Sequence, residues 1–404
     1  MDVEHTDLRQ LEPKRTRLCV LISSGILQLP IWGFFMSYGV FQESYFNNWT
    51  LQGNREITGV ISTTANGIVY LSMPFLFGFF TTRWAYRRQV AAMCGTATMC
   101  VSFFSSSYST TAWHLLVTQG ITSALGCALI YSPTTLSLGE WYTTSNRALA
   151  YGIILSCKNI VGTSCPFILR AMVDAYGYRT TLKAWTAIVG ATSILGIFLI
   201  PTHPSKLSIP PTRERKIPWN FLRHRSIYFY SIAIIFQSSG YGIPQTYLST
   251  YAKDIAFLSQ TSGTLMLAVF NAPRIIASSF FGCLSDNKRI ALSAQTVSAI
   301  PPVFSALSTF LFWGLTTQGG IGLLIVVDPG MLCGLLNGVR GIGYASGGFA
   351  GVGLLKAGSM ASSSSRFGYG TSYGPLILFT GISSLLGGWV VLWRWSQKGL
   401  SCHL

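Results

Sequence analysis

The chain has 404 residues, of which 50% are hydrophobic and only 10% are charged, and its mean hydropathy is +0.44. Soluble domains carry about 25% charged residues, so this composition excludes an ordinary soluble domain and indicates an all-α membrane protein. The net charge of +16 does not indicate nucleic-acid binding, because the basic residues lie in short gaps between apolar runs.

Eleven apolar runs approach the ~20 residues that a membrane-spanning helix needs. Six precede a polar segment, at residues 18–41, 58–80, 90–108, 113–138, 148–167 and 184–200, and five follow it, at residues 227–248, 262–284, 290–315, 330–355 and 376–395. The predicted domains are a cytoplasmic N-terminal tail (1–17), an N-terminal six-helix bundle (18–201), a basic cytoplasmic central loop (202–225), a C-terminal bundle (226–395) and a C-terminal tail (396–404).

The 28 Lys and Arg residues predict the orientation. With the N-terminus inside and one further span between residues 315 and 330, 18 of them lie on the inner side, which fits the positive-inside rule. We therefore expect a multi-pass plasma-membrane protein with a cytoplasmic N-terminus. Asn48 then begins a glycosylation sequon on the outer side. That this tripeptide occurs by chance is an equally good explanation. The seven residues expected outside are Arg55, Arg170, Arg179, Lys183, Lys253, Lys356 and Arg366.

The two halves of the sequence repeat each other, with one piece missing. Residues 38–42 match residues 241–245 at an offset of 203, whereas residues 152–158 match residues 334–340 at an offset of 182. The difference is close to one span of ~20 residues and falls where a tenth span is expected. Three explanations stay open: a lost exon segment, which we favour because the flanking sequence reads as intact, a degenerate copy, or two short spans within residues 290–327.

A basic hinge between two apolar runs, GFFTTRWAYRR at residues 78–88, returns in shorter form as GCLSDNKR at residues 282–289. It resembles the signature loop of the major facilitator superfamily of membrane transporters. Glycine in such a loop permits close helix approach, and arginine holds the loop in the cytoplasm and latches helix ends. The matching positions, expected to form a conformational-switch loop, are Gly78, Arg83, Arg87, Arg88, Gly282 and Asp286, whereas Thr82 and Ala85 depart from the pattern.

More narrowly, the chain resembles the monocarboxylate-porter branch in its fungal form. The resemblance implies two pseudo-symmetric six-helix bundles, alternating access to a central site, a small carboxylate substrate, and protons as a candidate coupling ion. Fungal relatives also export secondary metabolites. The residues that carry it are 38–43, 119–120, Trp141, 147–153, 328–330, 340–343 and 373–376.

Three cations lie well within predicted spans, and no acidic residue lies at comparable depth. Such residues are functional candidates by default, and arginine can hold a carboxylate through two parallel hydrogen bonds. The alternative role for the two arginines is to cap or latch helices. The alternative for the lysine is a position at the membrane interface. Asn271 stands where animal monocarboxylate carriers have an aspartate, which argues against proton coupling through this position. The predicted substrate-binding residues are Lys158, Arg274 and Arg340, with Asn271, Tyr38 and Tyr241 as weaker candidates.

No enzyme site is indicated. The five histidines do not cluster, nine scattered cysteines form no CxxC pair, and no P-loop is present, so we expect no cofactor and no metal. The sequence therefore predicts a secondary transporter for a small organic anion. Efflux of a fungal secondary metabolite is the first alternative, and a non-transporting or degenerate membrane protein that lacks one span is the second.

Overall fold

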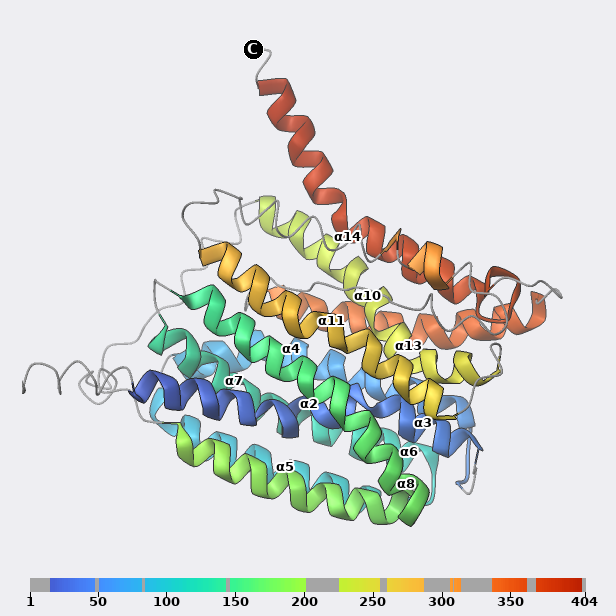
Figure 1. The fold of residues 1–404 in the computed structure, drawn as a ribbon, viewed down its shortest axis with the longest axis horizontal. Coiled ribbons are helices and arrows are strands. Elements are labelled where there is room, and N and C mark those ends of the chain that lie inside the picture. Colours follow the sequence, from blue (N-terminus) through green and yellow to red (C-terminus); the bar gives the residue numbers. More distant parts are fainter. Residues whose placement is uncertain are drawn as a thin grey trace, which may run out of the picture.

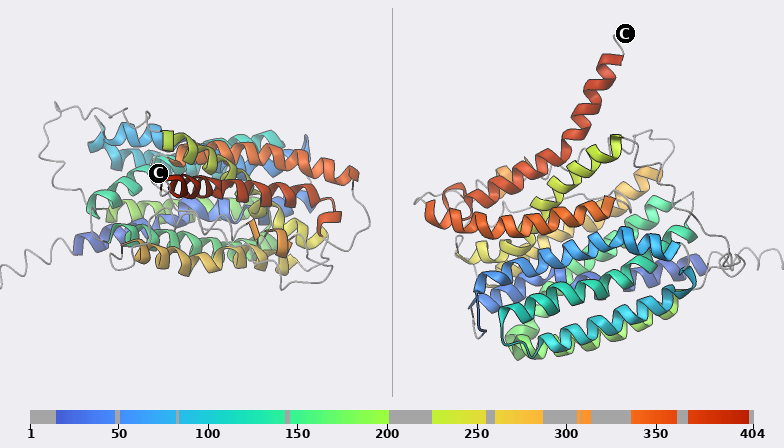
Figure 2. Two further views of the ribbon diagram at one scale, coloured as in Figure 1. Left: turned by 90° about the horizontal axis from the view of Figure 1, so that it is seen from above. Right: turned by 180° about the vertical axis from the view of Figure 1, so that it is seen from behind.

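The computed structural model describes residues 15–47, 51–81, 84–142, 146–200, 225–254, 260–286, 306–307, 309–313, 336–361 and 368–401. The elements within these ranges are helices, with one isolated β-bridge between Gln52 and Thr111. The helices run roughly along one axis and form a bundle, from which the last turns of α14 extend (Figure 1). Two further views show that the bundle is more than one layer deep (Figure 2).

The N-terminal half, residues 15–200, begins with a helical stretch at residues 15–26. One long element, α8, has non-helical backbone at Gly177 (φ 75°, ψ 162°), so it consists of two limbs that meet at a kink. The limbs form a V, which opens toward the left of Figure 1. The elements after residue 26 are α2 (Gln28–Met36), α3 (Tyr38–Asn47), η1 (Arg55–Val60), α4 (Ile61–Thr81), η2 (Ala85–Arg87), α5 (Arg88–Ser106), α6 (Ala112–Leu115), η3 (Leu116–Thr122), α7 (Ser123–Trp141) and α8 (Arg147–Leu199).

The C-terminal half, residues 225–401, contains α10 (Arg225–Asp254), α11 (Gln260–Asp286), η5 (Thr309–Trp313), α13 (Leu336–Ala361), η7 (Gly368–Gly370) and α14 (Gly374–Ser401). Among the described residues, five helical stretches are long and apolar enough to cross a membrane: Arg15–Tyr45, Glu56–Thr81, Ala112–Trp141, Arg147–Leu199 and Gly263–Leu284. The further span expected between residues 315 and 330 and the sequon at Asn48 lie outside the described residues.

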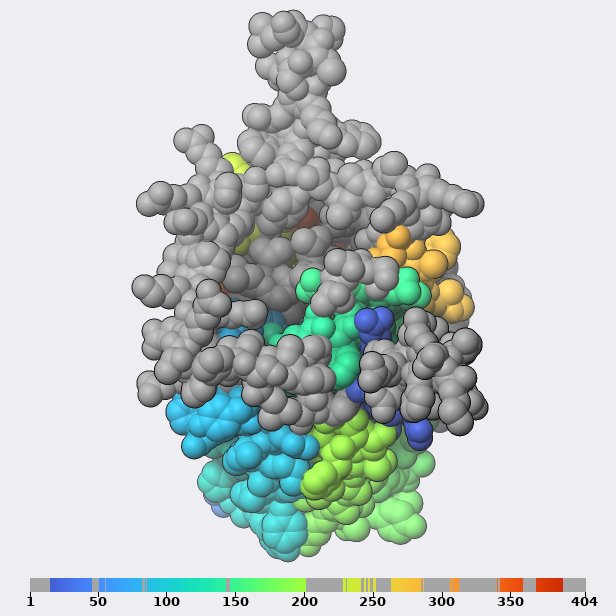
Figure 3. All heavy atoms as spheres, turned by 90° about the vertical axis from the view of Figure 1, so that its left-hand side faces the viewer, coloured from blue at the N-terminus to red at the C-terminus, as the bar shows by residue number. Residues whose placement is uncertain are grey.

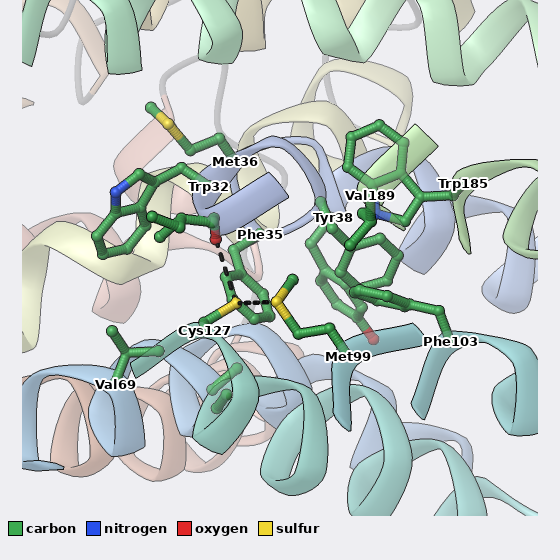
Figure 4. Packing of buried hydrophobic residues seen from close by; sticks show 14 of the residues in the cluster. Trp32, Phe35, Met36, Tyr38, Val69, Met99, Phe103, Cys127, Trp185 and Val189 are labelled. Carbon is green, nitrogen blue, oxygen red and sulfur yellow. Dashed lines mark hydrogen bonds between the residues drawn. The ribbon is translucent and has the colours of Figure 1, made fainter. Parts of the chain in front are cut away.

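The first half has its core around α2, whose residues are apolar on every side. A helix that is hydrophobic all round is stable only where neighbours cover every face, and here eight of its nine residues are buried. Figure 4 shows side chains of α2 and α3 packed among residues from α4, α5, α7 and α8. Polar contacts also cross this core, since the thiol of Cys127 on α7 donates to the carbonyl oxygen of Ile31 on α2.

Large apolar side chains also cover the outside of the helices. Phe75 is 75% exposed, Ile276 is 77% exposed and Phe198 is 69% exposed. They lie on α4, α11 and α8, and thus on both halves. Exposed apolar surface on this scale marks contact with a membrane or a partner. The protein therefore has a packed interior and an apolar exterior, as a lipid-embedded bundle requires.

The two halves meet chiefly where α8 lies along α11 and α4 lies along α13. Glycine allows the first contact to be close: a Cβ added to Gly152 would lie 2.6 Å from the carbonyl oxygen of Ser278, and one added to Gly282 would lie 2.7 Å from that of Ala148. Backbone therefore touches backbone from both sides, which is the role expected of small residues between membrane helices.

The sequence of α13 is rich in glycine between residues 341 and 353, which predicts a close-packing face, and these glycines act in the same way. A Cβ added to Gly343 would lie 2.5 Å from the carbonyl oxygen of Ile235 on α10, and one added to Gly348 would collide with Thr63 on α4. The predicted close-packing face is thus confirmed, and it serves two neighbours rather than one.

Candidate functional site

Four aromatic rings from both halves form a continuous group, here named the central aromatic cluster. Trp32 of α2 lies at its middle, 5.4 Å from Tyr70 of α4 and 5.6 Å from Tyr131 of α7, measured between ring centroids. Tyr70 in turn stacks on Tyr344 of α13 at 5.5 Å, with 9° between the ring planes. The cluster therefore joins the N-terminal half to the C-terminal half through the Tyr70–Tyr344 stack.

Two of the predicted substrate-binding cations lie on the faces of these rings. The ammonium nitrogen of Lys158 is 3.7 Å from the Trp32 ring centroid and 3.3 Å from the Tyr70 hydroxyl, to which it donates. The guanidinium carbon of Arg340 is 5.3 Å from the Tyr70 centroid and 5.7 Å from that of Tyr344. Both cations are only partly buried. They come from opposite halves and converge on one tyrosine.

The helix that carries Trp32 is short and is bounded by two breaks. The first span is broken on both sides of α2, at Leu27 and at Ser37, where the backbone amide of Ser37 reaches back to the carbonyl oxygen of Phe34. Discontinuous helices recur at the central sites of transporters. Trp32 lies on α2, between these two breaks.

Arg274 and Asn271 lie one turn apart on α11. The amide nitrogen of Asn271 donates to the carbonyl oxygen of Gly162 on α8 (3.3 Å) and to that of Leu267 on its own helix (2.9 Å). Asn271 is fully buried, and its hydrogen bond to Gly162 ties the two halves together. This is the packing role that neutral polar residues have between membrane helices. Arg274 is 5% exposed, and its guanidinium carbon lies 4.0 Å from the Phe270 ring centroid.

The structure describes the side chain of one of the two candidate tyrosines, Tyr38, but not that of Tyr241. Tyr38 begins α3 directly after the break, is fully buried, and donates its hydroxyl hydrogen to the carbonyl oxygen of Thr58 at 2.7 Å. It therefore holds α3 against the segment that leads into α4. Tyr241 belongs to α10, and its side chain lies outside the described residues.

A buried ion pair corrects two statements of the sequence analysis. Glu43 is only 2% exposed and pairs with Arg170 of α8, which is 7% exposed. The sequence placed Arg170 in an outer loop and found no acidic residue as deep as the cations. Helix α3 instead runs past the predicted end of the first span, and α8 runs past the predicted end of the fifth, so both residues are enclosed.

Arg170 also reaches the other half, because its Nε donates to the hydroxyl oxygen of Thr264 on α11 at 3.2 Å. Its Nη1 lies 3.9 Å from the more exposed carboxylate of Asp174. Among the described residues, the second carboxylate oxygen of Glu43 has no hydrogen-bond partner. The charged pair therefore fixes a guanidinium between α3, α8 and α11.

A π-helical turn in the fourth span supports the same region. Segment η3 interrupts the α-helix between α6 and α7, and such turns often mark functional sites. Within it, Gln119 donates from its amide to the Tyr45 hydroxyl at 2.9 Å and to that of Ser106 at 2.5 Å. Tyr45 lies two residues after Glu43. Gln119, in the fourth predicted span, therefore helps to position α3.

The first copy of the basic hinge acts within the N-terminal half. Arg88 is buried and donates to the carbonyl oxygen of Phe80 and to both carboxylate oxygens of Glu140, at 2.9 and 3.0 Å. It thus ties the beginning of α5 to the ends of α4 and α7. Arg87 is exposed and covers the Trp84 ring at 4.7 Å. Gly78 lies within α4, and Arg83 lies outside the described residues.

The second copy reaches across the halves. Asp286, the last residue of α11, accepts hydrogen bonds from the backbone amides of Ala148 (3.3 Å) and Leu149 (2.8 Å) at the beginning of α8. An acidic side chain there pairs with unsatisfied N–H groups and with the positive end of the helix dipole. From this end of the bundle, the beginning of α8 (green) and the end of α11 (orange) lie side by side (Figure 3).

Comparison with known proteins agrees with this architecture. The chain is similar to an MFS-type transporter of Gibberella zeae (25% identical over 260 residues, 63% of this chain and 56% of the relative). It is also similar to the agnestins efflux protein AgnL12 of Paecilomyces divaricatus (22% over 371 residues, 92% and 79%), and to human monocarboxylate transporter 12 (23% over 231 residues, 50% and 44%). The match thus spans little more than half the length of the first of these relatives.

A model of the Major Facilitator Superfamily matches residues 20–388, which include both halves, the central aromatic cluster and both copies of the hinge. The chain therefore belongs to the Major Facilitator Superfamily, and it is an integral, multi-pass membrane protein.

Proposed function

We propose that the protein moves a small organic anion across its membrane by alternating access, and that Lys158 and Arg340 bind the anionic group. Alternating access means that the two halves rock around a central site, which opens to one side of the membrane at a time. Arg274 is the third cation proposed for this role. The plasma membrane and a cytoplasmic N-terminus are the proposed setting.

One observation carries the proposal: cations from the two halves converge on the same Tyr70 ring. A carboxylate between them would contact both halves at once, and so could couple its own binding to their relative motion. Positive charge within a membrane bundle is costly and is by default a candidate for function, and two cations placed together suit an anionic ligand. The aromatic faces offset part of that cost while the anion is absent.

The proposal predicts that removing one of the cations weakens carboxylate transport. The test is uptake of labelled lactate, pyruvate and benzoate into proteoliposomes that contain the full chain or its Lys158→Met variant. A hydrogen bond to a charged group contributes about 1.5–3 kcal/mol, so we expect the apparent affinity to fall about ten- to hundredfold.

The matched control is Lys183→Met. Lys183 lies on the same helix α8 and also covers a tyrosine, with its ammonium nitrogen 4.5 Å from the Tyr108 ring centroid, but it is exposed on the outside of the bundle. This variant should transport like the parent protein. Equal loss in both variants, or undiminished uptake by Lys158→Met, would discard the role of Lys158.

Export of a metabolite is the second candidate, because one relative is named an efflux protein for agnestins. The anion site serves either direction. Metabolite profiling of cells with and without the gene separates the two: retention of an acidic metabolite in the deletion strain supports export, and failure to grow on a carboxylate supports import.

A further inference from the structure

We infer that Arg87 and the aromatic rings beside it form a binding site for the phosphate group of an anionic membrane phospholipid. This site lies on the outside of the bundle, at the end that carries the basic hinge. It is separate from the proposed anion site between the two halves, and neither site depends on the other.

Two aromatic rings hold the side chain of Arg87 in place. Its Nε donates to the Tyr86 hydroxyl at 3.0 Å, and its guanidinium carbon lies 4.7 Å from the Trp84 ring centroid. Trp84 stacks in turn on Phe79 of α4, at 5.1 Å with 17° between the ring planes. Tryptophan is the ring that attracts a cation most strongly. Arg87 is therefore positioned although it is exposed, so less side-chain freedom is lost when it binds a ligand.

The charge of Arg87 has no acidic partner among the described residues. The neighbouring Arg88 is buried and pairs with Glu140. The other carboxylates with described contacts are engaged elsewhere, namely those of Glu43, Asp174, Glu56 and Asp286. A guanidinium in this situation can hold two phosphate oxygens through two parallel hydrogen bonds.

Exposed apolar side chains lie on both sides of Arg87. Phe75 and Phe79 are exposed one turn apart on α4, and Val90 is exposed on the first turn of α5. The contacts from Phe79 through Trp84 to Arg87 thus lead from an apolar helix face to a cation. Tryptophan and tyrosine are enriched at the level of the lipid headgroups, and arginine extends its charge toward them. A phospholipid has the same order of groups, acyl chain and then phosphate, whereas a soluble anion has no part that matches the apolar face.

The length of α5 places Arg87 at a membrane boundary. Tyr108, just past the other end of this helix, is exposed and also has a cation on its ring, since the ammonium nitrogen of Lys183 lies 4.5 Å from its centroid. Positions 87 and 108 are 21 residues apart. At 1.5 Å per residue this distance is about 30 Å, the thickness of the hydrocarbon core. In the proposed orientation Arg87 lies in the cytoplasmic leaflet, which carries the anionic lipids.

The test measures lipid binding directly, on the full chain purified in detergent. Native mass spectrometry gives the dissociation constants of phosphatidylglycerol and of phosphatidylcholine with the same acyl chains. We expect the parent protein to bind phosphatidylglycerol more tightly, and Arg87→Gln to weaken that binding about fivefold, the effect of one basic residue at an anionic surface. Binding of phosphatidylcholine should change little. The variant should melt like the parent protein, because Arg87 is exposed.

Arg179→Gln is the matched control. Arg179 is also exposed, and its Nε also donates to the hydroxyl of the preceding tyrosine, Tyr178, at 3.2 Å. It lies beside the kink at Gly177, and its contacts among the described residues include no second ring. This variant should bind both lipids as the parent protein does. Trp84→Leu, which keeps the charge but removes the ring beneath it, should weaken binding of phosphatidylglycerol.

Three results would overturn the site: equal binding of the two lipids by the parent protein, undiminished binding of phosphatidylglycerol by Arg87→Gln, or equal weakening in Arg87→Gln and Arg179→Gln. The last result would mean that net charge alone attracts the lipid. Displacement of phosphatidylglycerol by an equal concentration of glycerol phosphate would overturn the choice of a lipid over a soluble anion.

Discussion

The Glu43–Arg170 pair shows how a single residue can decide the stability of the bundle. Both side chains are more than nine-tenths buried, and Arg170 also holds Thr264 of the other half. Two opposite charges enclosed together offset one another, but each alone is costly to bury. The pair therefore acts as a unit, and removing either partner exposes the full cost of the other.

We predict that Glu43→Ala lowers the free energy of unfolding by about 3–5 kcal/mol, the cost of leaving one charge of a buried pair uncompensated. The measurement is thermal unfolding of the purified protein in detergent. Replacing both residues with apolar ones, as in Glu43→Leu with Arg170→Met, should recover much of that loss.

Glu56→Ala provides the comparison. Its carboxylate pairs with Lys356 at 2.5 Å, but the two side chains are 41% and 58% exposed. Exposed pairs contribute about 0–1 kcal/mol, so this variant should melt close to the parent protein. A similar small effect for Glu43→Ala would contradict the description of Glu43 as a buried, paired charge.

At the scale of helices, the contact between α8 and α11 depends on glycine. Gly152 and Gly282 let the two backbones touch, and hydrogen bonds continue the contact along the helices: Ser156 donates to the Ile275 carbonyl oxygen, and Asn159 donates to the Ser278 hydroxyl. The interface is therefore tight along much of its length. A single added methyl group has no room near the hinge.

We predict that Gly282→Ala destabilises the protein by about 1–3 kcal/mol, the usual cost of overpacking. The added carbon would lie 2.7 Å from a backbone oxygen of Ala148, and backbone cannot move aside as a flexible side chain can. Thermal unfolding measures the effect, and the transport rate should fall with it because the two halves meet here.

Gly353→Ala is the matched control for this helix contact. Gly353 is also helical, on α13, but a Cβ there would meet nothing within 4 Å. Since alanine favours helix over glycine by about 0.5–1 kcal/mol, this variant should be neutral or slightly stabilised. Equal destabilisation of both variants would contradict the prediction, because the effect could then not come from the close contact with α8.

Across the whole molecule, the two halves are tied at both ends of the bundle. At the hinge end Asp286 of α11 holds the beginning of α8, and at the opposite end Lys356 of α13 holds Glu56 beside α4. The central aromatic cluster lies between these ends, where Tyr70 stacks on Tyr344. A rocking motion must break the ties at one end while keeping those at the other.

We predict that fixing the end opposite the hinges stops transport. In the double variant Glu56→Cys with Lys356→Cys, a short bifunctional thiol reagent should join the two halves and reduce uptake to background, and a cleavable linker should restore it after reduction. The two single-cysteine variants are the controls, because they retain the native cysteines but cannot be cross-linked at this site. Full activity after complete cross-linking would contradict alternating access.

Several features were already determined by the sequence. Composition and apolar runs of span length specify a membrane bundle, because in lipid every backbone polar group must find its partner within a helix. The repeat placed Lys158 and Arg340 at matching positions, and the structure finds both on Tyr70. The glycine-rich face of α13 followed from residue size alone, since only small residues allow such close approach.

Only the tertiary structure decided which distant residues meet. Glu43 and Arg170 are 127 positions apart, and each lies beyond the apolar run that marks its span, so no local pattern could pair them. The central aromatic cluster likewise draws one ring from each of α2, α4, α7 and α13, and a tyrosine in a span looks the same in sequence whether it stacks on a neighbour or faces lipid. Periodicity and hydropathy are properties of one segment, whereas the pairing of charges and rings depends on how segments are arranged around each other.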